Sequence, residues 1–129
     1  MPPIDQLQRP DAHEIEKLGR QGIFTTGLLL EVSETPTRRI TLADQIGVTT
    51  NDVNAWRDEA LLLNLAGFSH DTQVLFAQAG IIGLEDLLEL DLDAFAERLE
   101  QAGSLLEVDP PTALMIEGWW DQAQTLAET

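Results

Sequence analysis

The 129-residue sequence contains no cysteine and no tyrosine. The missing thiols exclude disulfide bonds, thiolate metal sites and cysteine nucleophiles together. With only four phenylalanines and three tryptophans, the core is expected to be mainly aliphatic. No stretch approaches the roughly 18 to 20 continuous apolar residues that span a membrane. The first residues, MPPIDQLQRPD, lack the basic and apolar regions of a signal peptide, so we expect a cytoplasmic protein.

Positive charge is scarce as well. Seven Lys and Arg residues face 23 Asp and Glu residues, which gives a net charge of −16. Residues 1–64 hold ten acids and six bases, a net charge of −4, whereas residues 65–129 hold thirteen acids and the single base Arg98, a net charge of −12. Such a surface repels phosphate backbones and anionic lipids and favours basic partners. The same acidity suits a protein from a high-salt cytoplasm, and charge alone does not separate the two.

The hydrophobic pattern predicts an all-α fold, because no stretch shows the period-two alternation of a half-buried strand. Capping residues and apolar spacing place helix starts near Asp11, Thr26, Thr41, Thr49 or Thr50, Ser69, Ile81, Asp91 and Asp109-Pro110. We expect a turn region over Val32–Arg39, because Pro36 disfavours helix at the residue before it. Gly103 is expected to end the helix that begins after Asp91, with a linker over Ser104–Val108.

One segment of the chain recurs. Gln21–Glu31 lies 58 residues before its counterpart Ala79–Glu89, and Trp56 and Trp119 occupy similar places in the closing helix of each half. We therefore expect two similar halves, residues 1–64 and 65–129, packed together so that each buries apolar faces of the other.

Short motifs in both halves carry a family resemblance. They are LGRQGI at 18–23, LA…GV at 42–48, VNAW at 53–56 and LAGF at 65–68. This pattern resembles the helix-hairpin-helix superfamily, and looks most like the tandem helix-hairpin-helix proteins of the bacterial domain-of-unknown-function family 4332. The resemblance covers roughly Ile4 to Leu126 and implies a duplicated, SAM-like helical domain. The family name implies no activity.

The resemblance also bears on DNA binding. DNA-binding helix-hairpin-helix modules hold a phosphate on the backbone N–H groups of a Gly-hydrophobic-Gly turn at a helix N-terminus. Here the second copy of that turn reads Gly67-Phe68-Ser69, and the first reads Arg9-Pro10-Asp11. Proline has no N–H to donate, and the aspartate stands where the phosphate would sit. The resemblance thus implies a retained scaffold with its phosphate-binding turns lost.

A nucleic-acid-binding protein remains the alternative. Leu42–Trp56 looks like a helix-turn-helix, whose second helix would enter the major groove. The candidate contacts of this alternative, including the Gly67 hairpin turn, are Asn51, Asn54, Arg57, Arg38, Arg39, Gly67 and Ser69. Against it, Asp52 would face the DNA, and a glycine-cornered pair of core helices explains the same pattern.

No group of residues has the spacing of a catalytic or metal site. The two histidines, His13 and His70, lack a second ligand at helical spacing. The Asp91-x-Asp93 pair begins like a calcium loop, but an apolar side chain and an alanine follow where a third oxygen ligand and a glycine are required. No glycine-rich phosphate loop is present. We expect no enzyme, no cofactor and no metal.

The preferred interpretation is a non-catalytic, acidic protein-interaction or adaptor module. Adjacent helix positions diverge by about 100°, so one of Trp119 and Trp120 is expected at an edge, where tryptophan is a typical binding hot spot. The candidate partner-binding residues are Trp119, Trp120, Glu85, Asp86 and Glu89. The expected partner is a protein, with a basic one favoured, and the Trp-bearing last helix is a candidate homodimer interface. A small-ligand pocket between the halves is the third alternative.

Overall fold

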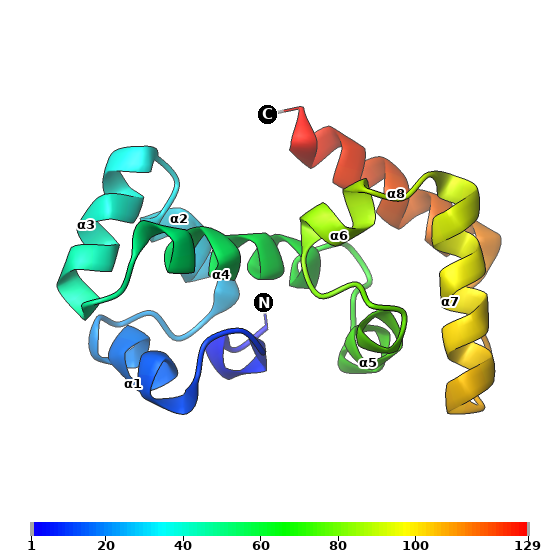
Figure 1. Cartoon of the computed structure of the whole chain (residues 1–129), viewed down its shortest axis with the longest axis horizontal. Helices are drawn as coiled ribbons and strands as arrows, with labels where there is room; N and C mark the ends of the chain where they lie inside the picture. Colours follow the sequence, from blue (N-terminus) through cyan, green and yellow to red (C-terminus); the bar gives the residue numbers. More distant parts are fainter. Residues whose placement is uncertain (1, 129) are drawn as a thin grey trace. The chain divides into compact units, whose positions relative to one another are not determined.

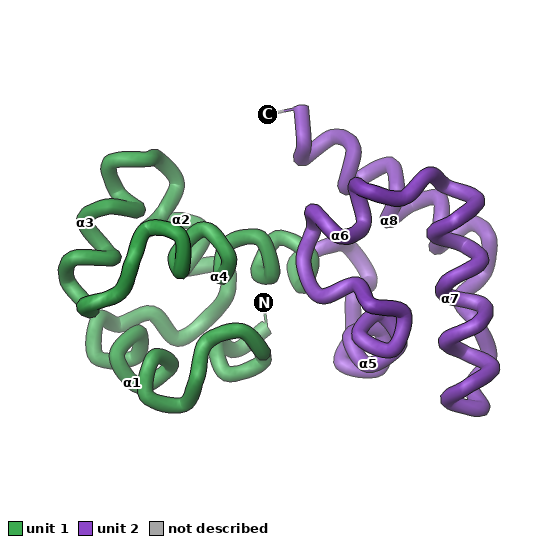
Figure 2. Tube along the Cα trace, in the orientation of Figure 1, with its two compact units in different colours: residues 1–64 green, residues 65–129 purple. Residues whose placement is uncertain are grey.

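A computed structural model describes residues 2–128 of the chain (Figure 1). Over that range the all-α prediction is confirmed, with eight α-helices, one short 3₁₀ helix, η1 (Ile4–Gln6), and no strand beyond an isolated bridge between Pro3 and Thr25. The chain divides into two compact units, residues 1–64 and residues 65–129, which are coloured separately in Figure 2.

Unit 1, residues 1–64, is built around its last helix. Its helices are α1 (Ala12–Arg20), α2 (Thr26–Val32), α3 (Pro36–Ile46) and α4 (Thr50–Leu63). Helix α4 packs against α2 and α3, and α1 packs against α3 and η1. The side chains buried between them are mainly aliphatic, among them Leu18, Leu29, Val53 and Ala60, and Trp56 is the one aromatic residue of this core.

Unit 2, residues 65–129, has helices α5 (His70–Gln78), α6 (Leu84–Leu88), α7 (Leu92–Leu106) and α8 (Ala113–Ala127). Helix α8 packs against α6 and α7, and α5 packs against α7. At the centre, Phe76 makes edge-to-face contacts with Phe68, Phe95 and Trp119, with ring centroids 5.0, 5.6 and 5.3 Å away. The expectation of a mainly aliphatic core is therefore wrong for the centre of this unit.

Side-chain caps explain where most helices begin. A hydroxyl or carboxylate oxygen accepts a first-turn backbone N–H at Asp11, Thr25, Thr35, Thr49, Ser69, Asp91 and Thr112. The predicted caps Asp11, Thr49, Ser69 and Asp91 are confirmed. The cap of α2 is Thr25 rather than Thr26.

Two predicted boundaries in unit 1 are wrong for one reason. Helix α3 begins at Pro36 rather than after Thr41, so the expected turn region over Val32–Arg39 is partly helical. Thr35 is extended, with φ −113° and ψ 157°, as a residue before proline prefers to be. That same backbone conformation is what an N-cap requires, and proline suits the first helical position. Pro36 therefore starts a helix instead of preventing one.

In unit 2, α7 continues past Gly103 to Leu106, so the prediction that Gly103 ends this helix is wrong. A Cβ atom at Gly103 would lie 3.2 Å from the carbonyl oxygen of Val108. The glycine thus leaves room for the chain that turns back after the end of the helix. Glu107, with φ 57°, ends the helix, and α8 begins after Thr112 rather than at Asp109-Pro110.

The opening elements of the two units recur at one spacing. Helices α1 and α5 have nine residues each and begin 58 positions apart, as do α2 and α6. Gly22 and Gly80, also 58 positions apart, follow α1 and α5 with φ of 79° and 81°. Positive φ at these corners favours glycine. Trp56 on α4 and Trp119 on α8 lie 63 positions apart, and both are buried.

Candidate interaction surfaces

The chain before α1 is held by a buried carboxylate on α4. Glu59, 1% exposed, accepts the backbone N–H groups of Gln8 at 2.6 Å and Arg9 at 3.0 Å. Burial raises the pKa of Glu59 above its ordinary value, and the two N–H donors oppose the rise. Arg9 also donates to the carbonyl oxygen of Ala55 and to Asp58, at 2.8 and 2.9 Å. The segment that leads into α1 is thus held by hydrogen bonds to α4.

In unit 2 the acceptor at the corresponding place is a neutral side chain. The amide oxygen of Gln122 on α8 accepts the N–H of Ala66 at 2.9 Å. Gln122 lies 63 positions after Glu59, and Ala66 lies 58 positions after Gln8, which are the spacings already seen for the helices. The carbonyl oxygen of Ala66 accepts from Nε1 of Trp119 at 3.0 Å.

The three arginines proposed as phosphate contacts face the connection between α2 and α3. Arg57 donates to the carbonyl oxygen of Leu30 and to Oγ of Ser33, both at 2.9 Å. Arg39 donates from Nε to the carbonyl oxygen of Ser33 at 2.8 Å, and Arg38 donates to that of Glu31 at 3.3 Å. Burial, and then the neighbouring Arg39, lowers the pKa of Arg57, which Glu34 opposes. The guanidinium groups together cap the carbonyl end of α2.

The remaining nucleic-acid candidates lie on α4 and just before α5. Asn51 and Asn54 are exposed on α4. Gly67 has φ 74° and open space at its Cβ position, and Ser69 Oγ accepts the N–H of Thr72 at 3.2 Å. Ser69 is therefore in use as the cap of α5.

The adjacent tryptophans of α8 differ in exposure. Trp119 is 2% exposed and belongs to the aromatic centre of unit 2. Trp120 is half-buried, and its indole N–H is buried without an acceptor among residues 2–128.

The acidic candidates lie on or beside α6. Glu85 and Glu89 are exposed, while Asp86 accepts the backbone N–H groups of Ile82 and Gly83 at 2.9 and 3.1 Å. Asp86 therefore closes the turn that leads into α6, whereas the two glutamates present their carboxylates at the surface.

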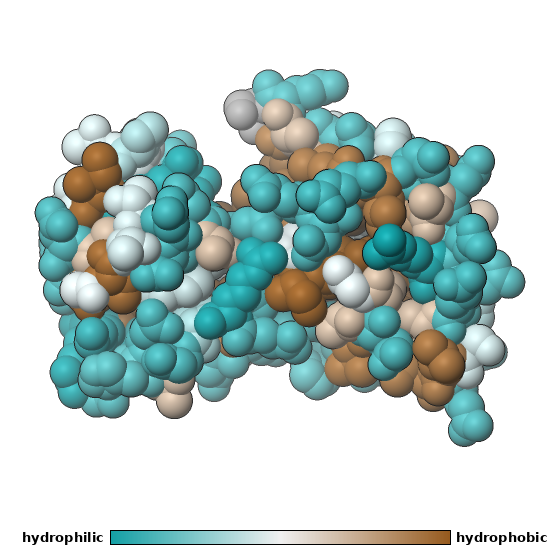
Figure 3. Space-filling model, viewed as in Figure 1, coloured by the Kyte–Doolittle hydropathy of each residue, from teal (hydrophilic) through white to brown (hydrophobic). Residues whose placement is uncertain are grey.

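Unit 2 carries an apolar groove that the sequence did not predict. It lies between α5, the end of α7 and the start of α8, with a volume of about 600 Å³. Its apolar lining residues are Val74, Leu75, Leu106, Val108, Pro111, Met115 and Trp119, and the polar ones are His70, Asp71, Thr72 and Asp109. Val74, Val108 and Met115 are 44%, 51% and 43% exposed. Brown, hydrophobic residues gather over α5 and the C-terminal end of α7 at the lower right of Figure 3.

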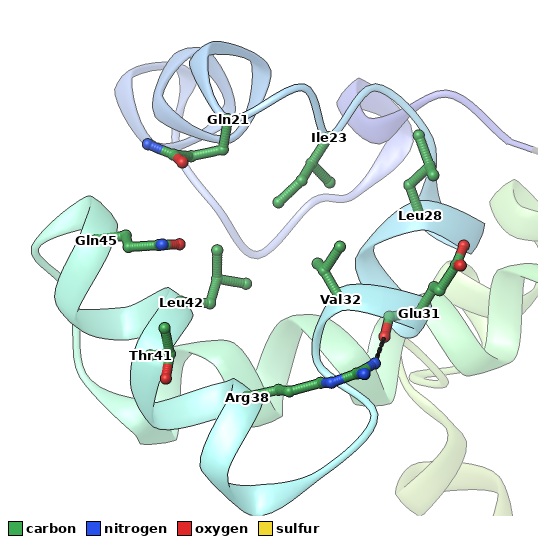
Figure 4. A pocket seen from close by; sticks show the side chains of 9 residues that line it. All are labelled: Gln21, Ile23, Leu28, Glu31, Val32, Arg38, Thr41, Leu42 and Gln45. Atoms are coloured by element: carbon green, nitrogen blue, oxygen red, sulfur yellow. Dashed lines mark hydrogen bonds between the residues drawn. The ribbon is translucent and has the colours of Figure 1, made fainter.

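Unit 1 carries a smaller pocket, of about 460 Å³, between the corner after α1, α2 and α3 (Figure 4). Ile23, Val32 and Leu42 point toward one another at its centre, and Arg38 closes one end through its bond to the Glu31 carbonyl. Gln21 and Gln45 lie at the other end. Arg38 is thus already held by the chain itself, and three apolar side chains form the centre of the pocket.

Among the described residues, no group of three or more His, Cys, Asp or Glu side chains is placed to hold a metal ion. Over the same part of the chain, none of the helices has the length and apolar character needed to cross a membrane.

Comparison with known proteins gives one result. The model of the family described as "Domain of unknown function (DUF4332)" matches residues 11–126, nearly the whole chain. No curated protein and no solved structure matches the sequence.

Proposed function

The chain belongs to the DUF4332 family, and we propose that it is a non-catalytic protein-interaction module. The observation that carries the proposal is the groove of unit 2, where Val74, Val108 and Met115 remain about half exposed. Apolar residues that gather on a surface and border a concave site are typical of protein-binding sites. The acidic residues around the groove favour solubility of the protein and leave the groove open.

The proposal includes the scaffold, a duplicated helix-hairpin-helix. Its support is the common spacing of 58 between the opening helices and the matching bonds from Glu59 to Gln8 and from Gln122 to Ala66. In each unit the last helix holds the chain that enters the first hairpin. Such a pattern follows naturally if one helical unit was copied and the two copies then diverged.

Nucleic-acid binding is the less favoured alternative. A phosphate needs uncommitted cations or N–H groups. Arg57 and Arg39 already donate to carbonyl oxygens of the chain, and the backbone N–H of Arg9 is taken by Glu59. A net charge of −16 also repels the polyanion at a distance.

The proposal is tested by placing a photo-crosslinking amino acid at one surface position at a time in the full chain. Val108, which lines the groove and is 51% exposed, reports on the groove, and Ile40, 52% exposed on α3, is the matched control. We expect protein adducts from position 108 that position 40 does not give. Equal adduct patterns from both positions would remove the support for a specific surface.

A gel shift against mixed single- and double-stranded DNA at about 50 mM salt tests the alternative, because electrostatic binding is strongest there. We expect no shift. A shift that disappears in Asn51→Ala and Arg57→Met variants would favour nucleic-acid binding over the proposed function.

A further inference from the structure

The groove of unit 2 has both an apolar floor and an acidic setting. We propose that it binds a basic amphipathic helix of a partner protein. This inference rests on the proposed function and adds the site and the chemistry of the partner.

Three of the apolar lining residues have charged counterparts in unit 1. Unit 1 has Glu16 at 58 positions before Val74, Lys17 at 58 positions before Leu75, and Asp52 at 63 positions before Met115. The same helices are thus built in unit 1 with charged side chains at these places. Unit 1 folds with charged side chains at the places that correspond to positions 74 and 115. The half-exposed apolar side chains at these positions in unit 2 are therefore available to contact a partner.

Charge selects the partner's polar face. Asp71 and Asp109 line the groove, and unit 2 has thirteen acidic residues against one base. That base, Arg98, lies beside Gly80, at the end of α5 opposite to His70. A docked segment would therefore meet carboxylates around an apolar floor, which complements lysine and arginine flanking an apolar stripe.

Backbone chemistry selects a helix. The walls of the groove come from helices, and residues 65–128 contain no strand that could pair with an extended peptide. A partner segment must then satisfy its own N–H and C=O groups, as a helix does. Met115 lies in the floor, and methionine adapts its shape to an inserted side chain.

The test uses three labelled synthetic peptides of about 18 residues, a length that spans about 27 Å as a helix. The first carries a leucine stripe with a lysine-rich polar face, the second the same stripe with a glutamate-rich face, and the third the composition of the first with the stripe scattered. Fluorescence anisotropy with the full chain should give binding of the first peptide at least about tenfold tighter than that of the other two. The affinity should fall as salt rises from about 50 to about 500 mM.

Variants place the peptide in the groove. Val74→Glu and Met115→Glu change exposed side chains, so both should keep the helical circular dichroism and thermal midpoint while weakening the first peptide at least about tenfold. Ile40→Glu makes the same change on unit 1 and should leave the affinity unchanged. The double variant Val74→Gln and Met115→Gln removes the apolar contacts without added charge and should weaken binding as well.

Five results would overturn the inference. Equal binding of the scattered peptide would show attraction by charge alone, and equal binding of the glutamate peptide would show that the acids do not select. Binding that Met115→Glu leaves unchanged would place the peptide elsewhere. A wild-type dimer in light scattering that Met115→Glu converts to a monomer would make a second copy the occupant. Groove-specific crosslinks without binding of the lysine peptide would refute this inference and leave the proposed function standing.

Discussion

The two units hold the chain that enters their first α-helix with different acceptors. In unit 1 the acceptor is the carboxylate of Glu59, which binds two backbone N–H groups, and in unit 2 it is the amide oxygen of Gln122, which binds one. A charged acceptor makes the stronger hydrogen bond, but burying a charge costs more free energy than burying a neutral amide. The chain before the first helix can therefore be held by a strong hydrogen bond with a large desolvation cost, or by a weaker hydrogen bond with a small one.

Cations follow the same division. Unit 1 contains six bases, and three of them, Arg38, Arg39 and Arg57, bind carbonyl oxygens around the end of α2. Unit 2 has only Arg98, and aromatic contacts around Phe76 fill its centre instead. Contacts between arginine and carbonyl oxygens are thus a feature of unit 1, and aromatic packing is a feature of unit 2.

The largest expected effect comes from two single variants, each of which removes one of these acceptors. Glu59→Leu leaves two partly buried N–H groups without a charged acceptor and should lower the free energy of unfolding by about 3 kcal/mol. Gln122→Leu removes one acceptor from an exposed N–H and should cost about 1 kcal/mol. Urea titration followed by circular dichroism measures both. Equal losses would show that the charge at position 59 adds nothing to the closure.

The return of the chain over α7 is the second difference. Gly103→Ala would place a methyl group 3.2 Å from the backbone carbonyl oxygen of Val108 and should destabilise the protein by about 1–2 kcal/mol. Gly118→Ala, in α8 with open space at Cβ, is the matched control and should stabilise it by about 0.5–1 kcal/mol. Thermal midpoints moving in opposite directions would confirm this, whereas two shifts of the same sign would mean that the contact at Gly103 is tolerant.

The third helix ends in a left-handed residue in each unit, and only unit 1 uses glycine there. Gly47 has φ 71° and Glu107 has φ 57°. Gly47→Ala should therefore cost about 1 kcal/mol, because side chains strain this conformation. Glu107→Gly should give a gain of up to about 1 kcal/mol for the same reason. Urea titration measures both changes, and a loss of stability in Glu107→Gly would show that its side chain contributes more than the strain removes.

The smallest effect is a pH dependence confined to unit 1. Burial raises the pKa of Glu59 above its ordinary value of 4.5. A raised pKa means that the folded state binds the proton more tightly, so this contribution to stability is fully present below pH 4.5 and is lost as pH rises through the folded value. The stability of wild type minus that of Glu59→Gln, measured by urea titration at each pH, should therefore decrease as pH rises above 4.5. The stability of Gln122→Glu minus that of wild type should change less with pH, because the N–H of Ala66 is exposed.

Local signals make much of the fold predictable from the sequence. Asp11, Thr49, Ser69 and Asp91 cap helices as predicted, because capping depends on residues within one turn. The helix boundaries at Pro36 and Gly103 are harder to predict, since proline and glycine each occur in two different structural roles. Proline before a turn and proline at the first helical position look alike in sequence, and a glycine that ends a helix resembles one over which another segment crosses.

The site residues are harder to predict because their partners are distant. Glu59 lies 51 residues from Gln8, and neither helical periodicity nor capping motifs give any sign of that pairing. The helix-turn-helix pattern suggests a phosphate contact for Arg57, but its hydrogen bonds reach Leu30 and Ser33, 27 and 24 residues away.

The groove is hidden in the sequence because Val74 and Met115 fit the apolar spacing of their helices. Spacing alone cannot tell an apolar side chain that the core buries from one that stays half exposed. Glu16 and Asp52 stand at the corresponding places in unit 1. Alignment of the two halves at these positions is therefore the signal that could reveal which apolar side chains the core does not need.

The closing bonds from Glu59 and Gln122 also bear on how the chain folds as it is made. Gln8 and Glu59 both belong to residues 1–64, and Ala66 and Gln122 both belong to residues 65–129. Since synthesis proceeds from the N-terminus, unit 1 has all the partners of its own closure before the last helix of unit 2 exists. Unit 1 can therefore close before unit 2 is complete, whereas refolding of the complete chain from denaturant starts both units at the same time.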